Sequence, residues 1–330
     1  MLPQSLLRRV GRRSLLAGAA ATVLSLGAVS AHAQDTLKLG LVAAMSGQSA
    51  KSGEAIVRGL SIAVDEVNAK GGLLGKKVEL IVRDDESNPA KGAIAARELV
   101  QREKVVALFG GLMILINNPW GESNEKGLKA ALEAKKVPYA GIEKFETNDV
   151  DVVPQLARLK EAGADVLFLV ANVAPSSQVV KSLDRMGWNV PIVSHWGPAG
   201  GRFSELAGPS ASKVHFIQTY SFSGKLAPKG EAVLAALKKK YPEIKTLADV
   251  TPAVGIANAY DALHLTALAI AKAGSVDGPK VREAFYAIDS YDGLIKSFKK
   301  PFSPENQDAL SEKDYIFTRF VEGEILPLTQ

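Results

Sequence analysis

The sequence contains no cysteine and only four histidines among its 330 residues. Without cysteine the chain has no disulfide framework, no thiol nucleophile and no cysteine that a lipid could modify after a leader. The three histidines beyond residue 33, His195, His215 and His264, lack the spacing of metal ligands. We therefore expect no metal centre and no cysteine-dependent enzyme.

Net positive charge outside the N-terminal region is also small. The formal net charge is +5, and four arginines without any acid fall within residues 1–33, which leaves +1 for the rest of the chain. A nucleic-acid-binding protein normally carries a basic patch or stripe. We expect no nucleic-acid partner.

Residues 1–33 have the organisation of a secretory signal peptide. Arg8, Arg9, Arg12 and Arg13 precede an apolar stretch from Leu15 to Val29, and Ala31-His32-Ala33 supplies a small-x-small cleavage pattern. The sequence predicts cleavage before Gln34 and no membrane insertion afterwards. An uncleaved N-terminal anchor is the alternative, and Arg12-Arg13 also fits a twin-arginine export signal.

The rest of the chain alternates apolar runs with segments of helical periodicity. This alternation indicates an α/β fold with parallel sheets that helices cover on both faces. The 330 residues less the 33 of the leader leave 297, which is large for one core and predicts two lobes. Strands are expected at 37–42, 78–82, 105–109, 113–117, 139–145, 165–170, 191–194 and 214–220, with a closing hairpin at 315–326. Helices are expected around 56–67, from 88, and at 123–135, 152–162, 176–186, 228–241, 252–273 and 278–288.

Two motifs that could carry chemistry have simpler interpretations. Gly71-Gly72-Leu73-Leu74-Gly75 follows a helix and precedes a strand, which is a tight turn and not a dinucleotide fingerprint. Asp84-Asp85-Glu86 could form a metal cluster, but acids between a strand and a helix more often cap the helix. No catalytic constellation emerges.

Polar and aromatic residues gather where several predicted strands end. In open parallel sheets, ligands bind outside the carboxyl ends of the strands. We expect Trp120 and Trp196 to form walls of a small-molecule pocket, whereas Trp188 covers the core. The residues at strand ends are Ser46-Gly47, Asn117 to Gly121, Asn172, and His195-Trp196-Gly197.

With these residues in view, the chain resembles the exported type I solute-binding proteins of ABC importers, typified by the leucine/isoleucine/valine-binding protein. The resemblance covers nearly all of the chain after the leader. It is carried by LKLGLVAAMSGQSAKSGEAIVRGLSIAVDEVNAKGGLLGKKVELIVRDDESNPAKG, NNPWGESNEKGLKAAL, VVPQLARLKEAGADVLFLVAN and AYDALHLTALAIAKAG.

The resemblance implies two Rossmann-like lobes with parallel sheets, joined by crossover segments and closing around a small ligand. Residues 34–112 and 222–312 correspond to the first lobe, and residues 113–221 and 313–330 to the second. It implies an ABC permease as partner, no cofactor and no enzymatic activity.

The same resemblance places ligand contacts at specific positions. Its first-lobe loop corresponds to Ser46 and Gly47, and a later contact to Ser52, where relatives often have an aromatic residue. A second-lobe tyrosine before glycine corresponds to Trp120. Further contacts correspond to Asn172, His195 and Trp196. Amino-acid binders hold the ligand ammonium with a second-lobe acid, and the loop at 195–197 has none, so an ordinary α-amino acid is not the expected ligand.

One stretch departs from the alternation. In VVALFGGLMILINN, residues 105–118, two apolar runs are separated by little more than Gly110-Gly111. Parallel strands need a connection of about a dozen residues, and relatives have a ligand-binding serine or threonine, a helix and further elements here. The first lobe therefore resembles an incomplete one with an internal deletion near residues 110–113. A local hairpin is the alternative.

We expect an exported, non-enzymatic protein that binds a small amino-acid-like, amide or aromatic carboxylate solute for an ABC importer. The alternatives are a ligand-sensing receptor domain, an α/β enzyme with a nucleotide cofactor, and a shortened derivative with impaired binding. The missing glycine fingerprint counts against the nucleotide enzyme.

Overall fold

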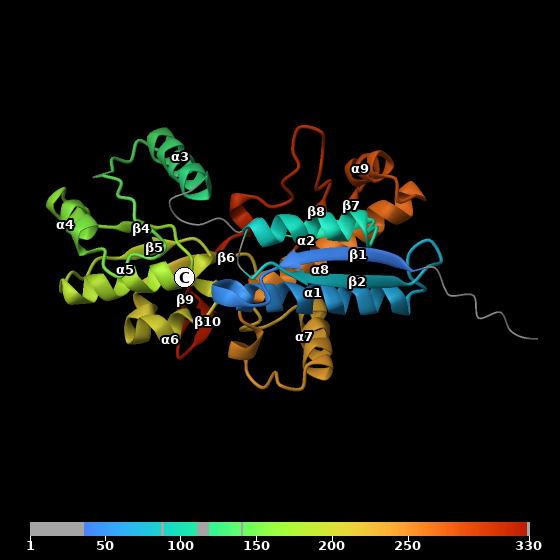
Figure 1. Ribbon diagram of the computed structural model, residues 1–330, viewed down its shortest axis with the longest axis horizontal. Helices are drawn as coiled ribbons and strands as arrows, with labels where there is room; N and C mark the ends of the chain where they lie inside the picture. The colour runs from blue at the N-terminus through green and yellow to red at the C-terminus, as the bar shows by residue number, and fades with distance from the viewer. Residues whose placement is uncertain (1–35, 87–88, 111–118, 140, 329–330) are drawn as a thin grey trace, which may run out of the picture. The chain divides into compact units, whose positions relative to one another are not determined.

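The computed structural model describes residues 36–86, 89–110, 119–139 and 141–328 (Figure 1). The described residues form a mixed α/β fold with two main sheets and a small hairpin. The predicted fold class is confirmed. The predicted leader, the run at 113–117 and the junction at 111–113 lie outside the described residues.

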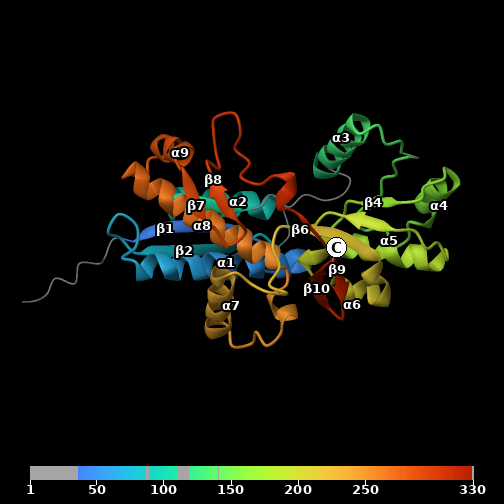
Figure 2. The same ribbon diagram turned by 180° about the vertical axis from the view of Figure 1, so that it is seen from behind.

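The first sheet is parallel and has the order β2-β1-β3. Strands β1 (Leu37–Ala43), β2 (Val78–Asp84) and β3 (Ala107–Gly110) lie close to their predicted positions. Side chains of β1 alternate between two cores, because successive residues of a strand point to opposite faces. Leu39 and Leu41 pack with helices α1 (Ala50–Ala69) and α8 (Ala253–Ala273), whereas Val42 packs with α2 (Pro89–Gln101). Figures 1 and 2 show these helices on either side of β1 and β2.

Close packing of α1 against α8 builds the larger core. A Cβ on Gly59 would lie 2.2 Å from the carbonyl oxygen of Ile256, so the helix backbones approach too closely for a larger residue. Of the described helices, α8 alone has the length and apolar composition of a membrane span, and 61% of that window is buried inside the protein. It is the central core helix of this region. Helices α7 (Pro228–Lys240) and α9 (Gly278–Tyr286) also pack around α8 and α1.

The second sheet has the order β10-β9-β6-β5-β4. Strands β4 (Leu167–Leu169), β5 (Ile192–Ser194) and β6 (Val214–Gln218) are parallel, as predicted. The closing hairpin of β9 (Ile316–Val321) and β10 (Glu324–Pro327) is confirmed and joins the sheet antiparallel to β6. Its turn uses Glu322 and Gly323, both at positive φ, the backbone geometry that a two-residue hairpin turn of this type requires.

Helices α4 (Val153–Glu161), α5 (Val173–Arg185) and α6 (Phe203–Ala207) cover one face of this sheet. Their shared core is centred on Phe320, whose ring contacts those of Phe203 and Phe216. Helix α3 (Pro119–Ala134) forms where the sequence predicted a helix.

The strand predicted at 139–145 is wrong. The described residues of this stretch form no strand. An extended segment becomes a strand only when it pairs with a neighbour, and ion pairs hold this one instead. Glu143 pairs with Arg158 of α4 at 2.7 Å, and Lys144 with Glu125 of α3 at 3.1 Å.

Strands β7 (Ser290–Asp292) and β8 (Ser297–Lys299) form a hairpin that was not predicted from the sequence. The buried carboxylate of Asp261 on α8 accepts hydrogen bonds from the backbone N–H groups of Leu294 (2.6 Å) and Ile295 (2.9 Å) in its turn. Burial raises the pKa of Asp261 above its ordinary value although these donors oppose the shift. A tertiary contact of this kind is not visible in local sequence patterns.

Candidate functional site

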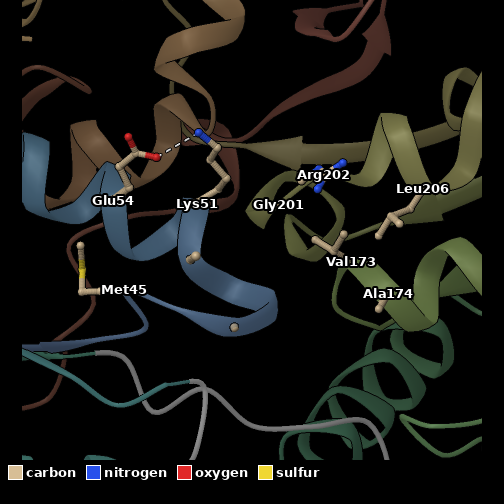
Figure 3. A pocket seen from close by; sticks show the side chains of 10 residues that line it. Met45, Lys51, Glu54, Val173, Ala174, Gly201, Arg202 and Leu206 are labelled. Carbon is tan, nitrogen blue, oxygen red and sulfur yellow. Dashed lines mark hydrogen bonds and ion pairs between the residues drawn. The ribbon is translucent and has the colours of Figure 1, made fainter. Parts of the chain in front are cut away.

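A cavity of about 410 Å³ is lined by the segment that follows β1 and by two segments of the second core (Figure 3). Its volume falls in the range typical of small-molecule sites. The lining from the β1 side comes from Met45, Gly47, Ala50, Lys51 and Glu54. The lining from the other side comes from Val173, Ala174, Gly201, Arg202 and Leu206.

The loop between β1 and α1 is shaped by two glycines. Gly47 lines the cavity at φ +78°, a conformation that L-residues with side chains rarely adopt. Gly53 brings the first turns of α1 against the chain after β1, because a Cβ there would lie 1.9 Å from the carbonyl oxygen of Ala44. Together they fix where Met45 and Lys51 enter the lining.

Asp84, the last residue of β2, is hydrogen-bonded to the same loop. Its carboxylate accepts hydrogen bonds from the backbone N–H of Met45 (2.9 Å) and the hydroxyl of Ser46 (2.7 Å). Desolvation alone would raise the pKa of Asp84, but these bonds and one from the N–H of Glu86 hold the pKa below its ordinary value. The acids after β2 were expected to cap a helix, and the carboxylate of Asp84 instead supports the cavity loop.

The opposite wall depends on the ends of β4 and β5. Three residues separate the end of β4 from helix α5, whose first residues Val173 and Ala174 reach the cavity. The chain after β5 runs through a short 3-10 helix, Gly197–Gly200, to Gly201 and Arg202. Phe203, fully buried, anchors α6 behind this wall.

The predicted site residues lie around the cavity to different degrees. Gly47 lines it, and Ser46 and Asn172 are chain neighbours of lining residues. The hydroxyl of Ser52 donates to the carbonyl oxygen of Gly200 at 3.3 Å, which links α1 to the wall after β5. The side chain of Trp120, at the start of α3, lies outside the described residues.

Two further predicted residues, His195 and Trp196, follow β5 but are not part of the lining. The indole of Trp196 is 43% exposed and stacks on Tyr315 with ring centroids 6.3 Å apart. The Nδ1 atom of His195 accepts from the N–H of Gly197 at 2.7 Å, so the neutral ring carries its proton on Nε2.

Burial lowers the pKa of His195 from 6.5 to about 4. Because the folded-state pKa is depressed, this group's stabilising contribution is complete above about pH 6.5 and is lost as the pH falls from 6.5 to about 4. We expect the wild-type protein to lose about 2–3 kcal/mol more unfolding free energy between pH 7.5 and 4.5 than the variant His195→Asn, which keeps an acceptor but does not titrate. Urea unfolding of both proteins at the two pH values measures this difference. Equal losses would contradict it, and the comparison at pH 7.5 isolates the cost of the substitution itself.

Of the ten lining residues, only Gly47 was among the predicted site residues, and the nine others include the side chains of Lys51, Glu54, Arg202 and Leu206. Lys51 and Glu54 occupy the first turns of α1, where charged residues normally indicate a solvated helix face. Arg202 precedes, and Leu206 lies in, a five-residue helix that is too short for a periodic signal. Their position shortly after the end of β5 is the signal that could have identified them.

The family model described as "Periplasmic binding protein" matches residues 36–114 and 112–322 of the chain. The chain belongs to this periplasmic binding protein family. The match comes in two segments that meet at residues 112–114, the place where the alternation of strands and helices breaks.

Curated relatives match shorter stretches of the chain. An "Amino acid binding protein" of Pseudomonas aeruginosa is 33% identical over 103 residues, which is 31% of this chain and 27% of the relative. A "Leu/Ile/Val-binding protein homolog 7" of Brucella abortus is 40% identical over 91 residues, 28% of this chain and 23% of the relative. The matched part of the chain therefore spans about a quarter of the length of these relatives.

Solved periplasmic binding proteins share the fold over most of the chain. A type 1 periplasmic binding protein of Bordetella pertussis superposes with a TM-score of 0.77 at 19% identity, covering 89% of this chain and 100% of that one. A solute-binding protein of R. palustris in complex with 4-hydroxybenzoate gives a TM-score of 0.69 at 19% identity, covering 89% and 96%. At these identities the likeness establishes a type I periplasmic binding fold, as the sequence predicted.

Proposed function

We propose that the chain is the exported solute-binding component of an ABC importer and works in the periplasm. It binds a small amino-acid-like, amide or aromatic carboxylate solute and delivers it to a membrane permease. In this proposal the protein catalyses no reaction and needs no cofactor, residues 1–33 are its cleaved signal peptide, and it inserts in no membrane after cleavage.

The observation that carries this proposal is the composition of the cavity lining. One half comes from the β1–α1 segment, which belongs to the core of the first sheet. The other half comes from the start of α5 and from residues 201–206 at the start of α6, which belong to the core of the second. A solute in this cavity would contact both cores at once, which is how a binding protein couples ligand to closure. This supports first-lobe segments 34–112 and 222–312, and second-lobe segments 113–221 and 313–330.

The experiment is a thermal-shift screen of the purified protein against amino acids, their amides, and aliphatic and aromatic acids. A ligand that binds only the folded state stabilises it by about 2.7 kcal/mol at 100 times its Kd. For a protein of this size we expect a rise in melting temperature of several degrees for one solute class. Failure of every class to raise it, with the fold intact, would contradict the proposal. N-terminal sequencing of exported protein tests the leader, and retention of Met1 in a membrane fraction would contradict cleavage.

A second candidate is a shortened derivative with impaired solute binding. It is favoured by the match of the family model in two segments that meet at 112–114, and by a first sheet with three strands among the described residues. Under this candidate the protein folds cooperatively and the screen finds no solute, which is the outcome that contradicts the first proposal.

A further inference from the structure

The charged residues of the cavity lining differ in how fully their charges are paired within the protein. The carboxylate of Glu54 is held by two cations, with Oε2 at 3.0 Å from Lys51 and Oε1 at 2.6 Å from Arg58 (Figure 3 shows the pair with Lys51). Arg58 is itself buried and donates a hydrogen bond to the carbonyl oxygen of Asp249 at 2.6 Å. The carboxylate of Glu54 is therefore paired within the protein and is not left free for a ligand. Of the charged lining residues, the two cations Lys51 and Arg202 against the one anion Glu54 leave one positive charge.

Only part of the Arg202 guanidinium is hydrogen-bonded to described residues. It stands at the start of α6, and Glu205 of the same helix accepts from its Nε at 2.5 Å and pairs with its Nη2. No described residue accepts a hydrogen bond from Nη1. The planar guanidinium has five N–H donors and binds carboxylates through two parallel bonds. Glu205 thus orients the group while its Nη1 edge stays available to a ligand. The pair with Glu205 is largely exposed and contributes little by itself.

The remaining lining is apolar. Met45, Val173, Ala174 and Leu206 supply side chains on both sides of the cavity (Figure 3). An aliphatic or aromatic body would lose water against these residues, which favours binding. An ammonium group would find only Glu54, which already has two cationic partners, and a buried charge without a partner is costly.

We propose that Arg202 binds the acid group of the solute and that the solute is a small apolar monocarboxylate rather than an α-amino acid. This inference rests on the proposed function, and it names Arg202 as the residue that determines solute class. Lys51 stays with Glu54 and adds to the positive potential.

Two sets of probes with matched skeletons test the inference by calorimetry on the full protein. The aliphatic set is 4-methylpentanoate, 4-methylpentanamide and leucine, and the aromatic set is 3-phenylpropanoate, 3-phenylpropanamide and phenylalanine. We expect the acid of at least one set to bind at least about 10-fold more tightly than its amide and its amino acid. Tighter binding of leucine or phenylalanine than of the corresponding acid would overturn the inference, as would failure of both acids to bind.

The variant Arg202→Gln should weaken binding of the preferred acid by about 10- to 100-fold and remove its advantage over the amide. Glu205→Gln is the matched control, because it removes the orienting partner and keeps the cation, and it should retain the preference for the acid. Melting temperatures show whether each variant folds. An acid affinity within about threefold of wild type in Arg202→Gln would overturn the role of Arg202. If a solute binds and only this change has no effect, the proposed function stands and the inference alone fails.

Discussion

Replacing Ala174 with tryptophan should weaken solute binding by at least about 100-fold without lowering the stability of the protein. Ala174 lines the cavity from the first turn of α5 and is only partly buried, so an indole there extends into the space that the solute needs. If the indole costs the solute two contacts, each worth as much binding free energy as a buried anchor residue, the affinity falls by about this factor. Calorimetry with the solute found in the screen measures the loss.

The matched control is Lys181→Trp, which places the same ring on an exposed position of the same helix. It should leave both affinity and melting temperature near the wild-type values. Wild-type affinity in Ala174→Trp, with an unchanged fold, would mean that the solute binds elsewhere.

Replacing Gly53 with alanine should destabilise the protein by about 3 kcal/mol or more. The new Cβ would lie 1.9 Å from the carbonyl oxygen of Ala44, and two backbone segments cannot separate as easily as a side chain can turn away. Overpacking of a well-packed region typically costs about 1–3 kcal/mol, and a contact with backbone falls at the upper end. Urea unfolding measures the change.

Gly127→Ala on α3 is the control for this prediction. A Cβ at Gly127 would meet no atom within 4 Å, and the position is exposed in the interior of a helix. The same substitution should therefore be neutral there or stabilise by up to about 1 kcal/mol. Equal effects at the two positions would contradict the close approach of α1 to the chain after β1.

Most elements of the fold follow from local patterns in the sequence. The apolar runs at β1, β2 and β6 and the long helical periodicity of α8 each match their structural bounds within a few residues. The failures have a common physical cause, because they concern segments whose conformation depends on a distant partner. The stretch at 139–145 had the composition of a strand, but its charged side chains pair with α3 and α4.

The sequence predicted chain segments next to the cavity better than it predicted the residues that line it. The rule that ligands bind at the carboxyl ends of parallel strands led to Gly47, which lines the cavity, and to Ser46 and Asn172, which are each next to a lining residue in the chain. It could not identify Glu54, because this residue enters the lining only through the close approach of α1 to the chain after β1 at Gly53. Arg202 follows the end of β5 and could have been found by the same rule, but it was not among the predicted residues. The position of a tryptophan at a strand end predicted the lining less well, since the exposed Trp196 stacks on Tyr315 and does not line the cavity.

The central claim is that the solute binds between the β1–α1 segment and the starts of α5 and α6. Amide hydrogen exchange with and without the solute from the screen tests it directly, because binding slows exchange where it orders the backbone. We predict slower exchange at residues 45–54, 172–176 and 200–206, with little change in the β7–β8 hairpin. Unchanged exchange in all three segments under saturating solute, with protection elsewhere, would contradict the site.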